Sequence, residues 1–288
     1  MELLRALAVL AEPPTDEQAG LLALLDLPGQ PDGAAFADVF LFQLYPYASV
    51  YLGPEGMLGG EARDRIAGFF RALDVTPPTE PDHLTVLLSA YADLVEREAE
   101  ATGEAAVAWR RSRAALLWEH LLSWVPVYLD RVRDVAGEPY RAWAELLDDV
   151  LRREVAVVGP PSELPLHLRE AQGLPDPREG ETKLFVAGLL APSRSGMILL
   201  RDDLATACRG LGIGLRIGER RFVLTSMLDQ DPTATLQWLA GRARAAAGRD
   251  HAWLGDVGAW WRDRARRTAD LLDEVATDAD RLRADTIA

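Results

Sequence analysis

An uncharged, aromatic stretch from Val39 to Pro54 limits what this chain can fold into. Other parts of the protein have to cover it, because exposed apolar surface is unfavourable in water. It is interrupted by proline and glycine and is too short for a membrane span, which needs roughly 20 apolar residues. The sequence therefore predicts a protein without stable membrane association, in which other elements pack over this stretch.

Apolar residues repeat at helical spacing along most of the chain, and one stripe is especially regular: Leu84, Leu87, Leu88, Tyr91 and Val95. Spacings of three and four residues place such side chains on one face of a helix. Prolines bound other helical patterns, as at Pro46 and Pro126. No segment alternates like a strand, and a hydrophobic content of 49% suffices for a core. We therefore predict an all-α, multi-helix bundle.

The segment 159–182 interrupts these helical patterns with five prolines and three glycines. Both residue types favour turns and loops. The sequence predicts an all-helical domain over residues 1–158, a linker or lid over 159–182, and a C-terminal helical extension over 183–288. Within the extension, helices are expected over about 184–190, 201–209, 219–228, 233–247 and 252–275.

Charge is distributed unevenly between the two parts of the chain. Residues 1–158 hold 26 acidic and 13 basic residues, whereas residues 159–288 hold 19 and 18. Such acidity disfavours nucleic acid as a partner of the N-terminal part and favours a basic ligand, although it also serves solubility. Cys208 is the only cysteine, which excludes an internal disulfide framework. The first apolar run is short and carries charges, so it does not predict a secretory signal, and we expect a cytoplasmic protein.

Sequence signatures of catalysis are weak. Residues 210–218 are rich in glycine but lack both the third glycine of a dinucleotide-binding loop and the Gly-Lys-Ser/Thr of a P-loop. The four histidines never pair at i, i+4, so a metal site would need distant helices to bring His83 and His120 together. We predict no enzyme activity, no cofactor and no metal, and keep a metal-dependent enzyme as a remote alternative.

A second alternative concerns residues 201–228. Two helical patterns around a glycine-rich turn, with Arg216, Arg220 and Arg221 near the second, resemble a helix-turn-helix. This pattern is generic, and acidic residues lie close by. A helical transcriptional regulator therefore remains the alternative function.

Three segments of the N-terminal part carry candidate functional residues. The first is the tyrosine segment, with Tyr45, Tyr47, Ser49 and Tyr51. The second is Glu80-Pro81-Asp82-His83, where Thr79 and Asp82 predict a capping box that begins a helix. The third is Trp118-Glu119-His120. Tyrosine and tryptophan offer apolar faces with a polar group at one end, which suits either a core or a groove that binds a peptide.

The order of these segments, followed by Trp124 and Pro126, resembles the TorD/DmsD family of redox-enzyme maturation chaperones, which is related to the nitrate reductase delta subunit. The Glu-Pro-Asp-His element is the most specific part of the resemblance, which covers about residues 1–158. The remaining residues depart from the short family pattern.

This resemblance implies a chaperone that binds the twin-arginine leader, or the apo form, of a molybdenum-containing oxidoreductase. It implies that the client contacts Tyr45, Tyr47, Ser49, Tyr51, Glu80, Pro81, Asp82, His83, Trp118, Glu119 and His120. The carboxylates would pair with leader arginines and the aromatic faces with its apolar part. The same residues could instead serve the fold, with Asp82 as a helix cap and the histidines and tyrosines in the core. The sequence leaves open whether the protein is a monomer or a homodimer.

Overall fold

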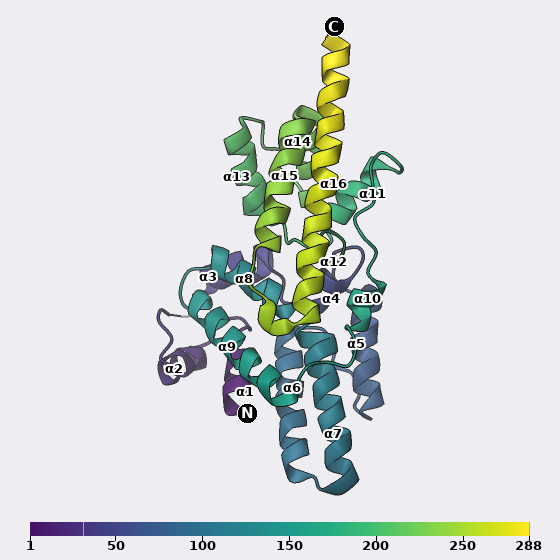
Figure 1. The fold of residues 1–288 in the computed structure, drawn as a ribbon. Helices are drawn as coiled ribbons and strands as arrows, with labels where there is room; N and C mark the ends of the chain where they lie inside the picture. The colour runs from purple at the N-terminus through teal and green to yellow at the C-terminus, as the bar shows by residue number, and fades with distance from the viewer. Residues whose placement is uncertain (31, 288) are drawn as a thin grey trace. The chain divides into compact units, whose positions relative to one another are not determined.

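The computed structural model describes residues 1–30 and 32–287, with side chains described up to residue 281, and the chain packs as two units (Figure 1). The first unit comprises Met1–Gly53 and Leu58–Arg169, and the second comprises Pro54–Met57 and the described part of Glu170–Ala288. Helices make up both units, and the described residues contain only an isolated bridge between Tyr47 and His83 and no strand. The predicted all-α fold is confirmed. The unit boundary after Arg169 falls inside residues 159–182.

The first unit contains ten α-helices and two π-helices among its described residues. They are α1 (Glu2–Val9), α2 (Asp16–Leu24), α3 (Gly33–Phe36), η1 (Ala37–Gln43), α4 (Ala48–Leu52), α5 (Gly60–Ala72), α6 (Leu84–Glu100), α7 (Gly103–Ala115), η2 (Leu116–Leu121), α8 (Val125–Val135), α9 (Tyr140–Val158) and α10 (Leu166–Glu170). Helices α6 and α7 lie side by side as a hairpin, and α1 packs on α6 (Figure 1).

Aromatic side chains fill the core of the first unit. Trp143 of α9 is fully buried, and its Nε1–H donates to the carbonyl of Leu7 in α1 at 2.9 Å. Trp124 is equally buried and stacks on Tyr51 with ring centroids 5.0 Å apart. The uncharged stretch of the sequence is thus covered by aromatic residues that lie far away in the chain.

A buried ionic network joins three helices of this unit. The Arg113 guanidinium of α7 donates to Glu98 of α6 at 3.0 Å and to Glu154 of α9 at 2.5 Å. The Tyr91 hydroxyl accepts from Arg113 at 2.9 Å and donates to Glu154 at 2.7 Å. Arg110 also donates to Glu98, at 2.8 Å, so two arginines balance the two glutamates, and losing one partner would be strongly unfavourable.

The second unit has its own hydrophobic core. Its helices are α11 (Thr182–Leu189), α12 (Pro192–Ser195), α13 (Arg201–Leu211), α14 (Arg220–Gln230), α15 (Pro232–Ala247), the 3-10 helix η3 (Ala252–Leu254) and α16 (Asp256–Ile287). Helices α15 and α16 lie side by side (Figure 1), and buried residues of α11, α13 and α14 pack with them. Asp231 caps α15 by accepting the N–H of Ala234 at 3.1 Å.

The structure corrects several sequence predictions. The prediction of a capping box from Thr79 and Asp82 is wrong, because α6 begins at Leu84. His83 is the N-cap of α6, and its Nδ1 accepts the N–H of Thr85 at 3.3 Å. The sequence predicts that Pro126 bounds a helical pattern, but it does not predict helix α8, in whose first turn Pro126 lies. The short helix α4 inside the tyrosine segment was also not predicted.

Among the helices that the structure describes, none combines the length and the apolar character needed to cross a bilayer.

Exchanging Trp143 for phenylalanine tests the link between α9 and α1. The variant removes the donor to Leu7 in a fully buried place and leaves a smaller ring, so the free energy of unfolding is expected to fall by about 1–3 kcal/mol. Chemical denaturation followed by circular dichroism measures this change. Trp109→Phe is the matched control, since Trp109 is only half-buried and contacts the Arg97 guanidinium at 5.1 Å. The free energy of unfolding of this control should fall by less than about 1 kcal/mol. Equal falls in both variants would contradict the role that we assign to the hydrogen bond from Trp143 to Leu7.

Candidate functional site

The tyrosine segment and the Glu80–His83 segment lie directly against each other. The N–H of Ala48 donates to the carbonyl of Asp82 at 2.9 Å, and the N–H of Leu84 donates to the carbonyl of Pro46 at 2.8 Å. These two bonds frame the isolated antiparallel bridge between Tyr47 and His83. Two of the three candidate segments, more than thirty residues apart in sequence, therefore form one local structure.

Asp82 is enclosed by this local structure. Its side chain has only 2% exposure, and Oδ2 accepts the N–H of Ser49 at 3.2 Å. Ser49 is fully buried, and its Oγ accepts the N–H of Gly59 at 3.1 Å. Pro81 is buried beside them. These three residues hold the two segments together, and they expose little surface to a ligand.

Glu80, by contrast, lies at the surface. Its carboxylate accepts the Tyr47 hydroxyl at 2.9 Å and is exposed. The half-buried Tyr47 ring packs edge-on against His83, with ring centroids 4.7 Å apart. Burial and the bond to Glu80 raise the pKa of Tyr47, so its hydroxyl stays protonated and donating at neutral pH. This arrangement holds Glu80 while leaving much of its carboxylate accessible.

His83 is neutral in this setting. Burial lowers its pKa, against the opposing effect of Glu12, Glu80 and Asp82. Its Nδ1 accepts from the Thr85 N–H, so the Glu12 carboxylate, 3.5 Å from the same nitrogen, does not receive a proton from it. Three carboxylates thus surround an uncharged histidine, and no described cation lies among the groups that perturb its pKa. The sequence did not indicate Glu12, which reaches this place only through tertiary packing.

The remaining two tyrosines differ in exposure. Tyr51 is buried at 1%, and its hydroxyl donates to the carbonyl of Tyr45 at 2.8 Å. Tyr45 itself is 36% exposed, close in sequence to the exposed Leu41 and Phe42 of η1. The sequence did not indicate that these two apolar side chains lie at the surface. Leu41, Phe42 and Tyr45 form an exposed apolar set that we call the apolar edge.

The Trp118-Glu119-His120 segment lies on η2 and makes separate contacts. The indole N–H of Trp118, a buried side chain, donates to the carbonyl of Gly159 at 3.0 Å. The Glu119 carboxylate accepts the N–H of Leu166 at 2.7 Å, and burial raises its pKa. A groove of about 340 Å³ runs beside these two residues, with Arg111 and an ion pair of Arg169 and Glu163 on its walls.

His120 is buried between aromatic rings. Its ring centroid lies 5.1 Å from that of Phe69 and 6.0 Å from that of His167, and its Nδ1 has no hydrogen-bond partner among the described residues. Burial, assisted by His167, lowers its pKa to about 3. Trp124 connects this segment to the tyrosines, since its indole donates to the His120 carbonyl at 2.8 Å and its ring stacks on Tyr51.

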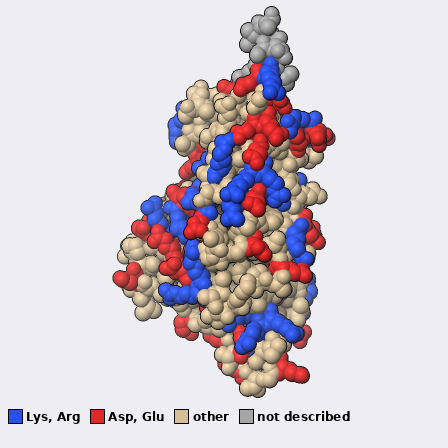
Figure 2. All heavy atoms as spheres, viewed as in Figure 1, with Lys and Arg blue, Asp and Glu red and all other residues tan. Residues whose placement is uncertain are grey.

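The structure shows neither alternative site in the described part of the chain. Within residues 1–30 and 32–281, no three His, Cys, Asp or Glu side chains converge as metal ligands would. Between α13 and α14 lie residues 212–219, a longer connection than the 3–4-residue turn of a helix-turn-helix. Acidic and basic side chains are interspersed over the face drawn in Figure 2, so the negative net charge does not gather there.

Residues 32–130 match the family model of the nitrate reductase delta subunit. The matched region contains the tyrosine segment, the Glu80–His83 segment and the Trp118–His120 segment. No curated protein matches the chain.

Replacing the buried carboxylate of Asp82 by alanine should weaken the fold. The variant leaves the Ser49 N–H without a partner in a fully buried place, and we expect a loss of about 1–3 kcal/mol in the free energy of unfolding. Glu80→Ala is the matched control two residues away, because it removes an exposed carboxylate and should change stability by no more than about 0.5 kcal/mol. Urea titration measures both. Similar losses in the two variants would show that Asp82 has no special role.

His120 should make stability depend on pH. Its folded pKa of about 3 lies below the ordinary value of 6.5, so only the unfolded chain takes up this proton at intermediate pH. Stability is therefore lost as pH falls from about 7 towards 3, by up to about 1.4 kcal/mol per pH unit. His120→Phe keeps an aromatic ring and removes the titration, so its stability should fall less steeply over this range. Urea titrations from pH 7 to pH 4.5 give the free energy of unfolding at each pH. If it falls equally steeply with pH in the variant and the parent, His120 is not the source of the pH dependence.

Proposed function

We propose that this protein is a non-catalytic chaperone for the apo form of a molybdenum-containing oxidoreductase, because residues 32–130 match the nitrate reductase delta subunit family, whose members mature molybdoenzymes as chaperones. We further propose that it acts in the cytoplasm and binds the twin-arginine leader of its client. The observation that carries this proposal is the family match over the same residues that form the Tyr47 and Glu80 arrangement.

The proposed arginine contact is the exposed carboxylate of Glu80, together with that of Glu12. Both lie near the neutral His83 and the protonated Tyr47, so neither ring supplies a positive charge that would neutralise them. A guanidinium matches a carboxylate with two parallel hydrogen bonds. An arginine of a leader would therefore find acceptors that the first unit leaves accessible.

The proposed contact for the apolar part of the leader is the apolar edge. Leu41 is 49% exposed, Phe42 58% and Tyr45 36%. Large apolar side chains at these exposures stabilise an interface when a partner removes them from water. Tyr45 belongs to the segment that also carries Tyr47, so one extended peptide could use both kinds of contact.

The other predicted contact residues have supporting roles in this proposal. Ser49, Tyr51 and Asp82 are buried and hold the tyrosine segment in place. Trp118 and Glu119 line a separate groove, which we assign to a different part of the client. His120 lies in the core beneath it. The alternative of a transcriptional regulator finds no support in the family match, which ends at residue 130.

Binding of a synthetic peptide with two adjacent arginines and an apolar stretch tests the proposal. Glu80→Gln should raise its Kd about tenfold, which corresponds to about 1.4 kcal/mol. The effect should shrink as salt rises, because exposed attractions are screened over about 8–10 Å near physiological ionic strength. Titration calorimetry at two salt concentrations measures both changes, and a peptide with lysines in place of arginines tests recognition of the guanidinium.

Two matched controls accompany this experiment. Glu104→Gln removes an exposed carboxylate at the start of α7 and should leave Kd unchanged. Phe42→Ser should weaken binding, whereas Leu24→Ser, at an 80% exposed position of α2, should not. The proposed site is wrong if Glu80→Gln binds like the parent, or if Glu104→Gln weakens binding as much.

A further inference from the structure

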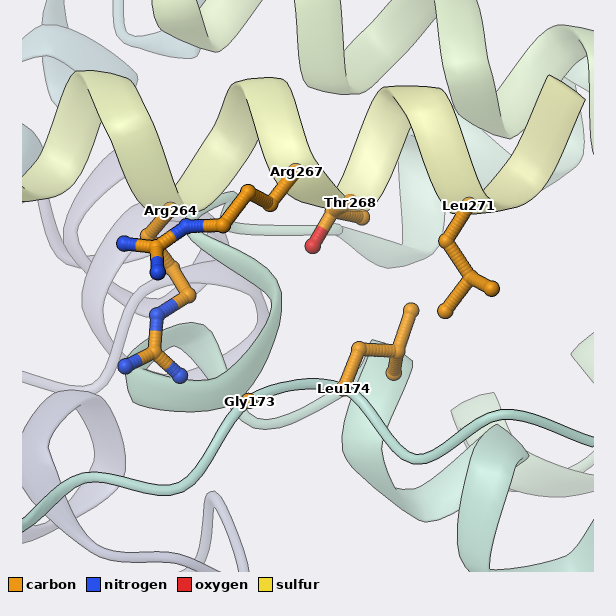
Figure 3. Close-up of a pocket in the computed structure, with 6 residues that line it drawn as sticks. All are labelled: Gly173, Leu174, Arg264, Arg267, Thr268 and Leu271. Atoms are coloured by element: carbon orange, nitrogen blue, oxygen red, sulfur yellow. The ribbon is translucent and has the colours of Figure 1, made fainter. Parts of the chain in front are cut away.

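A small pocket in the second unit is lined by arginines that lack acidic partners. It has a volume of about 200 Å³ and lies between α16 and the segment before α11 (Figure 3). Its lining residues are Gly173, Leu174, Arg264, Arg267, Thr268 and Leu271. None of the six is acidic, although the whole chain has a net charge of −14.

The four residues from α16 share one face of the helix. Positions 264, 267, 268 and 271 follow the spacing i, i+3, i+4, i+7, which normally marks an apolar stripe. Figure 3 shows both guanidinium groups on one side of the Thr268 hydroxyl, and Leu271 facing Leu174 on the other side. The pocket therefore has a cationic end and an apolar end.

Arg264 is held in place by neutral groups. It is 7% exposed, donates to the carbonyls of Ala171, at 2.7 Å, and Gln172, and lies 4.6 Å from the Trp260 ring. Its buried Nε has no hydrogen-bond partner among the described residues. Carbonyls and a ring orient the guanidinium without neutralising its charge.

A third arginine lies nearby. Arg194 of α12 approaches Gln172, the residue that also binds Arg264, with NH2 3.5 Å from Oε1. The turn after α12 packs tightly on α16: at Gly196, with φ +72°, an added Cβ would lie 2.4 Å from the Ala265 nitrogen. Burial, together with Arg267 and Arg194, lowers the pKa of Arg264 to about 10, so the group remains charged at pH 7.

None of these three arginines forms an ion pair with a carboxylate in the part of the chain that the structure describes. Arg267 donates only to the carbonyl of Asp263, at 3.2 Å. Arg178, in the segment before α11, shows the contrast, since it pairs with Asp176 and, on α16, with Glu274 and Asp278 at 2.7–3.0 Å. Like charges that gather without counter-charges are unfavourable, and an anion at the pocket would relieve this.

We propose that this pocket binds a phosphate group, either as free phosphate or as the monoester of a small organic molecule. Two guanidinium groups suit a dianion better than a singly charged carboxylate. The Thr268 hydroxyl has no hydrogen bond to another described residue and points toward the 173–174 segment, where it can donate to a phosphate oxygen. A volume of about 200 Å³ is below the roughly 300–1,000 Å³ of sites for drug-sized ligands, which favours a small ligand.

Titration calorimetry of the full chain with inorganic phosphate and with phenyl phosphate, at constant ionic strength set by chloride, tests the proposal. Arg267→Gln should raise the Kd of the tighter ligand at least tenfold, because it removes an accessible charge that lines the pocket. Arg266→Gln is the matched control, since Arg266 is exposed, pairs with Asp263 at 3.6 Å and does not line the pocket. Both variants keep a side chain with good helix propensity.

The two ligands distinguish the source of the phosphate group. Tighter binding of phenyl phosphate, weakened by Leu271→Ser while inorganic phosphate is unaffected, identifies an organic monoester that uses the apolar end. Equal or tighter binding of inorganic phosphate identifies the free ion. The proposal is overturned if neither ligand binds at millimolar concentration, if Arg267→Gln binds like the parent, or if Arg266→Gln loses as much affinity. Thr268→Val, which keeps the side-chain shape, should also weaken binding.

Discussion

Two main-chain hydrogen bonds between residues 46–48 and residues 82–84 determine how the first unit arranges its candidate site. They satisfy backbone groups next to Pro46, which has no N–H of its own. They also bring Tyr47 against His83 and place the Asp82 carboxylate on the Ser49 N–H. The start of α6, the burial of Ser49 and the position of Glu80 all depend on this short contact between segments distant in the chain.

This contact separates the roles of two neighbouring carboxylates. Asp82 points into the protein and accepts from a buried backbone N–H, whereas Glu80 is exposed and its carboxylate accepts from the Tyr47 hydroxyl. A similar division applies on η2, where Glu119 faces a groove and His120 lies in the core. Neighbouring residues of one segment therefore divide between stabilising the fold and lining a surface or a groove.

The second unit shows a different use of charge. Residues 159–288 are nearly neutral overall, yet their arginines are not uniformly paired. Arg178 pairs with three carboxylates, while Arg264 is oriented by carbonyls and the Trp260 ring. Orientation without neutralisation leaves positive charge available to a ligand, which is the physical basis for assigning an anion site to α16 and not to the glycine-rich residues 210–218.

The sequence by itself determined the all-α fold and most helices, because helical periodicity and proline breaks act locally. It could not place the start of α6, since the cap at His83 depends on a tertiary contact that outweighs the local signal from Thr79. Only the tertiary structure decided which motif residues are buried, brought Glu12 beside His83, and aligned Arg264 and Arg267 with residues 171–174. Burial and charge proximity arise from packing between distant segments, and a linear pattern does not contain them.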